Sequence, residues 1–386
     1  MESTILLNSL GVSNFKIKGM MFRYSIFAPK LYNFCLSLGF TPGKILPSRA
    51  FCSDENQGFP IIMIAKHFGG FPFNHGQVGG IVATDRNLPH AKHGKDMLII
   101  QASHVGFDPE SNRFGSYRRL QTEQQETSSS CGKVDAVISW YLSEFHFAQN
   151  NIYIEKSSGN YFITIDNQLL DDSREVGVFL QLDKMLLEDT ASPVEVYSTS
   201  KKYKLSESFI NTLDSSYIES LATANNHKLV IGAQLKKAHF YFKKTLAGDI
   251  EGHVHLERNL LPKMPVVVTS EVPLLTAAIL NTQVEFDRTY RTLIKDTSYK
   301  NKKLLLISGI NIDISPEAGQ RFPLTKFVPW AAFVQDNNGE SYILEQQELF
   351  DKLNEQPITN PNKINLEDEI EKMINAKEVI ISLPDE

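Results

Sequence analysis

The stretch KKLLLISGINIDI, residues 302–314, carries apolar side chains at consecutive positions rather than at alternate ones. Such a run predicts a central strand that is buried on both faces. Similar runs occur at 45–51 and 97–102, and helical spacing is found at 131–145 and 271–293. Strands that alternate with helices predict an α/β fold with a mostly parallel β-sheet wrapped by helices. Further strands are expected at 160–165, 228–235 and 265–269, and further helices at 60–68, 205–221 and 341–354.

Composition narrows the class of protein. The chain has 386 residues, of which 42% are hydrophobic and 22% charged, a balance typical of globular proteins that excludes a disordered or fibrous chain. The net charge is −6 and the isoelectric point is near 6.0, so no basic field favours nucleic acid as a partner. No uninterrupted apolar run reaches the length of a membrane span, so we expect no membrane partner.

The chain contains three cysteines, Cys35, Cys52 and Cys131. An odd and small number in a chain of this length is not a disulfide framework, and it indicates a reducing, cytoplasmic location. Residues 1–51 hold six basic residues and one acidic residue, a composition that keeps organellar targeting open. We expect residues 1–44 to form an N-terminal extension, 45–340 a single domain, and 341–386 a C-terminal helix and tail.

Three residues with metal-binding side chains lie at the ends of expected elements. Cys52 follows the strand at 45–51, His104 follows the strand at 97–102, and Cys131 begins a helix for which Ser130 is the expected N-cap. Sites in wrapped parallel sheets lie beyond the carboxyl ends of the strands. Two thiolates and one imidazole can hold Zn2+ and leave a fourth position for water. Taken on their spacing alone, these cysteines could equally be buried packing residues.

Five short motifs in sequence order resemble the limiting-CO2-inducible B/C family, a group of β-type carbonic anhydrases. They are CSDE at 52–55, GGFPFNHGQVGG at 69–80, HAKHGKDMLIIQASHVGFDPE at 90–110, FGSYRR at 114–119 and SSSCGK at 128–133. A weaker resemblance to the same family is found in LLLISGINIDI and RFPLTKFVPW. The resemblance implies a β-carbonic-anhydrase-like fold for the domain at 45–340, and it implies that Cys52, His104 and Cys131 are the zinc ligands.

The resemblance also implies two catalytic residues. Asp54 matches an aspartate that pairs with an arginine and opens or closes the fourth zinc position. The usual Cys-x-Asp-x-Arg continues here with Asn56, so the arginine must come from elsewhere. Arg119 fits the motif best, and Arg118 is the next candidate.

The implied function is reversible hydration of CO2 to bicarbonate by zinc-bound hydroxide in a homodimer, with Zn2+ as cofactor and CO2 and bicarbonate as small-molecule partners. A second hypothesis is a catalytically inactive zinc-binding member that acts as a CO2/bicarbonate-responsive or interaction protein. The missing arginine at the usual place keeps it open. A third is a different zinc hydrolase with the same ligands.

Four other histidines are weaker candidates. His90 and His93 could shuttle protons, although a structural or solvent-facing role is the simpler interpretation. His253 and His255 would share one face of a strand and could bind a metal, but no carboxylate–histidine pattern accompanies them, and the flanking Asp249 and Glu251 more simply mark a surface hairpin.

Overall fold

The computed structural model describes residues 15–83, 96–118, 127–171, 174–187, 192–224, 227–247, 253–317, 320 and 323–378. Contacts divide the chain into two compact units. The sheet unit comprises Phe15–His104 and Glu285–Glu386, and the insert unit comprises Val105–Val284. This division differs from the expected segments, because residues 15–44 and 341–378 belong to the same unit as the central strands.

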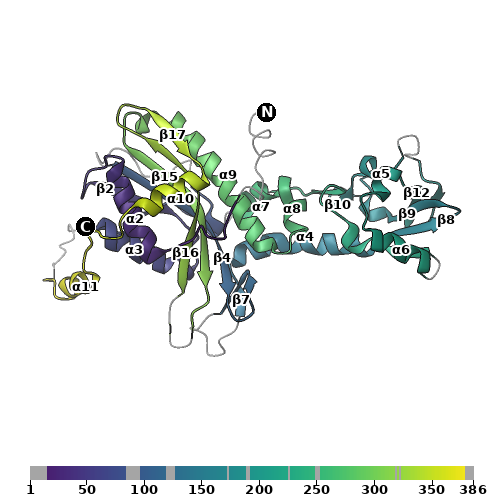
Figure 1. Cartoon of the computed structure of the whole chain (residues 1–386), viewed down its shortest axis with the longest axis horizontal. Coiled ribbons are helices and arrows are strands. Elements are labelled where there is room, and N and C mark those ends of the chain that lie inside the picture. Colours follow the sequence, from purple (N-terminus) through teal and green to yellow (C-terminus); the bar gives the residue numbers. More distant parts are fainter. Residues whose placement is uncertain are drawn as a thin grey trace, which may run out of the picture. The chain divides into compact units, whose positions relative to one another are not determined.

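The sheet unit is built on the largest sheet of the described chain (Figure 1). Its strands follow the order β1-β16-β15-β4-β2-β3. Two short strands attach beside this path, β17 to β16 and β5 to β4. The bounds are Phe22–Arg23 for β1, Ile45–Ala50 for β2, Phe73–Asn74 for β3, Asp96–Asp108 for β4, Arg113–Phe114 for β5, Leu304–Ile314 for β15, Leu324–Gln335 for β16 and Ser341–Leu344 for β17.

Parallel pairing is concentrated at one end of this sheet. Strand β2 runs parallel to both β3 and β4, with Ala50 opposite Gln101. Strands β15 and β16 form a long antiparallel pair, whose register shifts between Ser308 and Gly309. The α/β class expected from the sequence is confirmed, and the parallel strands are the ones that lead toward Cys52 and His104.

Both faces of the sheet are covered, as the apolar runs predict. Leu98 and Ile100 of β4 pack in one cluster with helices α2 (Tyr24–Ser37), α3 (Gly58–Phe68) and α10 (Gln346–Glu355) (Figure 1). Met97 and Ile99 pack in a second cluster with α9 (Pro273–Lys295). Successive side chains of a strand point to opposite faces, so a strand buried on both faces needs apolar residues at every position.

The segment before residue 45 is part of this core. Tyr24, Phe27 and Leu31 of α2 are fully buried, and the Phe27 ring stacks on Phe327 of β16 with the centroids 4.2 Å apart. Cys35 is buried in the same cluster, so this thiol is a packing residue of the core. Residues 15–44 are therefore an integral element of the fold and not a peripheral extension.

The insert unit contains a separate antiparallel sheet with the order β11-β12-β9-β8-β13. Helix α4 (Gly132–Asn150) leads into it, and the helices α5 (Glu207–Ile210), α6 (Ser215–Thr223), α7 (His253–Leu260) and α8 (Met264–Val268) complete the unit. The strands of this sheet are β8 (Ile152–Ser157), β9 (Asn160–Asp166), β11 (Glu195–Val196), β12 (Ser200–Lys204) and β13 (Lys228–Val230). Two separate two-stranded sheets are formed by β6 (Ser116–Arg118) with β7 (Thr127–Ser129) and by β10 (Gly177–Leu180) with β14 (Phe240–Lys243).

Several sequence predictions in this half of the chain are wrong. The expected strand at 265–269 is helix α8, because Pro265 opens a helical turn and burial of the valines outweighs their preference for strands. The expected strand at 228–235 ends at Val230. His253 and His255 lie on helix α7, where residues two apart point to different faces. The expected metal pair on a strand is therefore absent.

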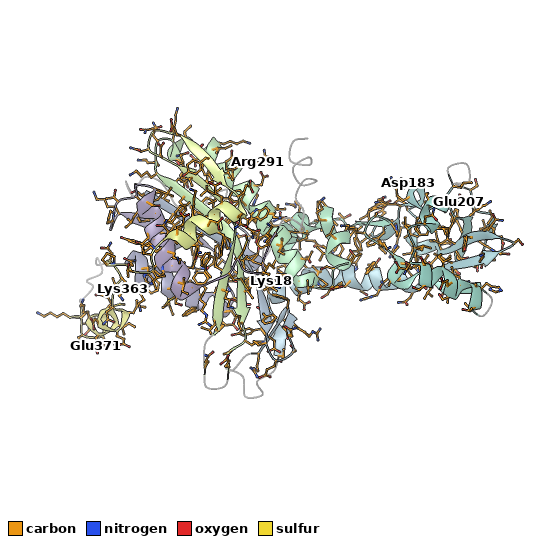
Figure 2. The ribbon with its side chains drawn as sticks, viewed as in Figure 1. Lys18, Asp183, Glu207, Arg291, Lys363 and Glu371 are labelled. Atoms are coloured by element: carbon orange, nitrogen blue, oxygen red, sulfur yellow. The ribbon has the colours of Figure 1, made fainter. Side chains whose placement is uncertain are left out.

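The C-terminal segment contributes buried side chains of β17 and α10 to the core of the sheet unit, namely Leu344, Leu349 and Leu353. The helix predicted at 341–354 is divided into strand β17 and helix α10. Helix α11 (Leu366–Ile374) follows and has no buried residue. Figure 2 labels Lys363 just before this helix and Glu371 within it. Within the part of the chain that the structure describes, no helix has the length and apolar character needed to cross a bilayer.

The core role of α2 can be tested by shortening Phe27. We expect Phe27→Ala to lower the free energy of unfolding by about 3–5 kcal/mol, because it leaves a cavity against Phe327. Ile26→Ala on the same helix is the control, since Ile26 is 38% exposed. Urea denaturation measures both variants, and equal small losses would contradict a core role for α2.

Candidate metal centre

Cys52 is placed by the end of strand β2. The strand ends at Ala50, and both Phe51 and Cys52 are buried. Asp54 then caps a short 3-10 turn, Glu55–Gln57, by accepting a hydrogen bond from the Asn56 N–H. Helix α3 follows and ends at Gly69 in a left-handed conformation, which a residue without Cβ adopts at little cost. The sharp turn after β2 therefore holds Cys52 in the interior.

His104 lies within a strand and not beyond one. The strand expected at 97–102 extends over 13 residues, Asp96–Asp108, because Phe107 and Asp108 still pair with β5. The His104 side chain points to the same face of the sheet as Leu98, Ile100 and Ala102, because residues two apart in a strand share a face. This face is the one covered by α2 and α3. His104 is only 1% exposed.

Cys131 occupies the N-cap position of helix α4, and the expected capping by Ser130 is wrong. The Gly106 N–H donates to the Ser130 carbonyl over 2.8 Å, and the Ser130 N–H donates to the Gly115 carbonyl over 3.0 Å. A Cβ on Gly106 would lie 2.9 Å from the Ser130 Cβ, so only glycine permits this approach. Cys131 is therefore held beside the strand that carries His104, and the helix dipole favours its thiolate.

The ligand atoms of Cys52, His104 and Cys131 all lie within 4.8 Å of one another, and all three side chains are buried. The cysteines are not joined in disulfides. The Nε2 atom of His104 is buried and has no hydrogen-bond partner among the described residues. Two sulfurs and an unsatisfied imidazole nitrogen fit the donor set that holds Zn2+ with one position open. The sequence prediction that these residues converge on a possible metal site is confirmed.

Asp313 of β15 orients His104. Its Oδ2 atom lies 2.8 Å from His104 Nδ1. Oδ2 also accepts a hydrogen bond from Gln57 Nε2 over 2.8 Å, and Oδ1 accepts one from the Thr325 hydroxyl over 2.9 Å. A carboxylate at this position keeps a proton on Nδ1, so Nε2 is the nitrogen that is left for the side of the two cysteines.

The electrostatics of this pair follow from its burial. Burial opposes a charge on His104, but the hydrogen bond and charge of Asp313, together with the Cys52 thiol, raise the pKa of His104 well above its usual value. Burial also raises the pKa of Asp313, and the hydrogen bonds from His104 and Thr325 oppose that rise. A cation that binds at Nε2 would replace the proton and leave the bond to Asp313 intact.

Asp54 faces the same nitrogen. Its Oδ2 atom lies 3.9 Å from His104 Nε2, while Oδ1 makes the cap to Asn56. The Asp54 side chain is 10% exposed, whereas that of His104 is 0% exposed. The sequence left a cap role and a zinc role open for Asp54, and the structure shows the cap together with a position beside His104.

The glycine-rich segment 69–80 supplies a contact to a candidate ligand. The Gly79 N–H donates to the Cys52 Sγ over 3.1 Å. Gly80 has a φ of +83°, and a Cβ there would lie 2.5 Å from the Ala102 carbonyl oxygen. Just beyond, the Val82 N–H donates to the buried carboxylate of Glu285 over 2.8 Å. The segment is thus tied to both the sheet and helix α9.

The remaining sequence candidates are placed less directly. Arg119, the expected partner of Asp54, lies outside the described residues, as do His90 and His93. Arg118 is described, and its guanidinium donates to Glu110 over 2.5 Å. Pairing between Asp54 and an arginine stays a prediction.

Sequence analysis missed the residues that support His104. Asp313 lies in the run 304–314, for which the sequence predicts a buried strand and shows a weak resemblance to the family, but no site residue. A carboxylate and the nearby Asn311 in a strand buried on both faces were a usable signal, because buried polar side chains require partners.

Comparison with protein-family models and with curated proteins finds no match. Among solved structures, the fold is similar to a crystal structure of PtLCIB4, a homologue of the limiting CO2-inducible protein LCIB. The TM-score is 0.48 and the identity 12%, over 85% of this chain and 95% of that chain. The fold is also similar to a crystal structure of LCIB, with a TM-score of 0.43 and 11% identity over 85% of this chain and 96% of that chain. At this level of identity the likeness concerns the fold and not the activity.

The glycine contact to Cys52 generates a prediction. We expect Gly80→Ala to cost about 1–3 kcal/mol of unfolding free energy, because the site needs a positive φ and has no space for a Cβ. It should also weaken metal binding by moving the Gly79 N–H away from Cys52.

Gly70→Ala in the same segment is the matched control, because no atom lies within 4 Å of its Cβ position. Urea denaturation and titration with Zn2+ compare the two variants. Identical behaviour would show that the glycine segment does not position the thiol.

Proposed function

We propose that this chain is a zinc-dependent carbonic anhydrase that interconverts CO2 and bicarbonate. The observation that carries the proposal is the buried group of Cys52, His104 and Cys131, with the His104 Nε2 lone pair turned toward both sulfurs. The five sequence motifs around these residues support the same activity.

Zinc bound by two thiolates and one imidazole would lower the pKa of a water molecule in the fourth position and so supply a nucleophile for CO2. Residues of the chain would orient the ligands and the nucleophile. Asp313 fixes the ring of His104, and the Gly79 N–H draws charge from the Cys52 sulfur, which makes that ligand a weaker donor. Asp54 Oδ2, which lies 3.9 Å from His104 Nε2, would accept a hydrogen bond from that nucleophile and orient it.

A second candidate function is zinc binding without turnover, with the protein responding to CO2 or bicarbonate. Asn56 favours it, because it occupies the position at which the related motif carries an arginine. Asn56 is 2% exposed and does not supply the positive charge that would hold Asp54 ready for catalysis. Both candidates require the same metal, so only turnover separates them.

Two further features belong to the proposal. Zinc thiolates require a reducing compartment, since oxidation would remove both sulfur ligands, and this favours a cytoplasmic or reducing organellar location. A homodimer, with CO2 and bicarbonate as small-molecule partners, is proposed on the motif resemblance alone.

Metal content and activity test the proposal together. The purified protein should contain about one zinc per chain and should accelerate CO2 hydration in a stopped-flow assay. Cys52→Ser, His104→Ala and Cys131→Ser should each abolish both properties, because each removes a ligand. Cys35→Ala is the control, because that thiol is buried in the core outside the site.

The outcomes separate the two candidates. A protein that holds no zinc excludes both of them. A fully zinc-loaded protein that does not hydrate CO2 excludes the enzyme and leaves the CO2/bicarbonate-responsive protein.

Asp54 provides a sharper prediction within the enzyme hypothesis. Asp54→Asn keeps the capping oxygen for the Asn56 N–H but loses the negative charge near His104 Nε2. We expect zinc content to stay unchanged and the rate of CO2 hydration to fall about 100-fold. Loss of zinc in this variant would identify Asp54 as a metal ligand instead.

A further inference from the structure

A chain of buried hydrogen bonds extends from His104 to the N-terminal helix α2. The Tyr24 hydroxyl donates to Asn311 Oδ1 over 2.8 Å. Asn311 Nδ2 donates to Gln57 Oε1 over 2.7 Å, and Gln57 Nε2 donates to Asp313 Oδ2 over 2.8 Å. Asp313 Oδ2 in turn lies 2.8 Å from His104 Nδ1.

Every member of this chain is withdrawn from solvent. Tyr24, Asn311 and Asp313 are 0% exposed, and Gln57 and His104 are 1% exposed. No member can exchange its partner for bulk water, so a bond that is lost leaves a polar atom unsatisfied. The five residues come from α2, the 3-10 turn after Cys52, β4 and β15, all within the sheet unit.

The bonds point in one direction. Each amide accepts through its oxygen and donates through its nitrogen, so the order Tyr24, Asn311, Gln57 delivers an N–H to the carboxylate of Asp313. Reversing the Gln57 amide would turn its oxygen toward that carboxylate, and reversing the Asn311 amide would turn its oxygen toward the Gln57 oxygen. Burial raises the pKa of Tyr24 well above its usual value, which keeps its hydroxyl protonated and available as the donor that begins the chain.

The tyrosine itself is rigidly held. Its ring makes edge contacts with Phe27, Phe51 and Phe327, with centroids 5.4, 6.5 and 6.2 Å away. Phe51 directly precedes Cys52 in the chain. The hydroxyl of Tyr24 is therefore fixed relative to the segment that carries a candidate metal ligand.

We propose that Tyr24 is a positioning residue for the metal centre, acting through Asn311, Gln57 and Asp313 to hold His104 with Nε2 directed at the ion. The proposal rests on the zinc site of the proposed function. It assigns to α2 a part in metal binding that is separate from its part in the core.

The test is a double-mutant cycle on zinc affinity, measured by competition with a chromophoric chelator. Tyr24→Phe removes one hydroxyl and should raise the dissociation constant for Zn2+ about fivefold, the effect of one buried hydrogen bond. Gln57→Met interrupts the chain one step from Asp313 and should raise it by about tenfold or more. In the double variant Tyr24→Phe should add little, because its connection to Asp313 is already broken.

Tyr32→Phe is the matched control. Tyr32 lies on the same helix, is 2% exposed, and its hydroxyl accepts a hydrogen bond from Asn362 Nδ2 over 2.6 Å. If a hydroxyl has only a structural role, its removal lowers the free energy of unfolding equally with and without zinc and leaves the zinc affinity unchanged. We expect this result for Tyr32→Phe.

The outcomes are distinct from those that test the proposed function. Wild-type protein that does not bind zinc overturns the metal site itself. Wild-type protein that binds zinc, with affinity unchanged by Tyr24→Phe or with additive effects in the double variant, overturns only the role of Tyr24.

Discussion

The hydrogen bond between His104 and Asp313 is the interaction on which the metal centre depends. It joins β4 to β15, adjacent strands of the main sheet. Both side chains are ionisable and almost fully buried, an arrangement that is costly unless each group is paired. The Gln57 amide and the Thr325 hydroxyl donate to the carboxylate, and His104 Nε2 is left with no hydrogen-bond partner among the described residues. The hydrogen bonds that compensate for burying this pair therefore also leave Nε2 as the atom that a metal ion could bind.

The two cysteines reach this nitrogen by different routes. Cys52 follows β2, whose parallel pairing with β4 sets its distance from His104. Cys131 depends on the bond from Gly106 to Ser130, two residues after His104 and one before Cys131. Gly80 and Gly106 permit backbone approaches that a side chain would block, and the Gly79 N–H contacts Cys52, so the glycine-rich motif can position the centre without binding a ligand directly.

The structure also changes the role of the N-terminal part of the chain. The basic composition of residues 1–51 favoured an extension or a targeting segment, yet α2 contributes three fully buried large side chains to the core. Composition reports net charge, whereas burial depends on which face of the helix meets the sheet. The lysines of this segment are compatible with both outcomes, because a long side chain can bury its stem and keep its ammonium group accessible. Lys30 is itself buried, and its ammonium group donates to the Asn354 and Gln356 carbonyls over 2.5 and 2.6 Å.

The sequence by itself determined the strands buried on both faces, the α/β class and the three candidate ligands, because apolar runs and motifs are local patterns. It failed at 265–269 and at His253 and His255, where packing overrides the local preference for strand. Only the tertiary structure decided that His104 lies inside a strand, that Cys131 occupies the N-cap position of a helix, and that buried hydrogen bonds join His104 to Asp313, Gln57, Asn311 and Tyr24. These residues are up to 287 positions apart in a single hydrogen bond, and the pairing of β4 with β15 brings them together. Pairing at such separation leaves no periodic trace in the sequence.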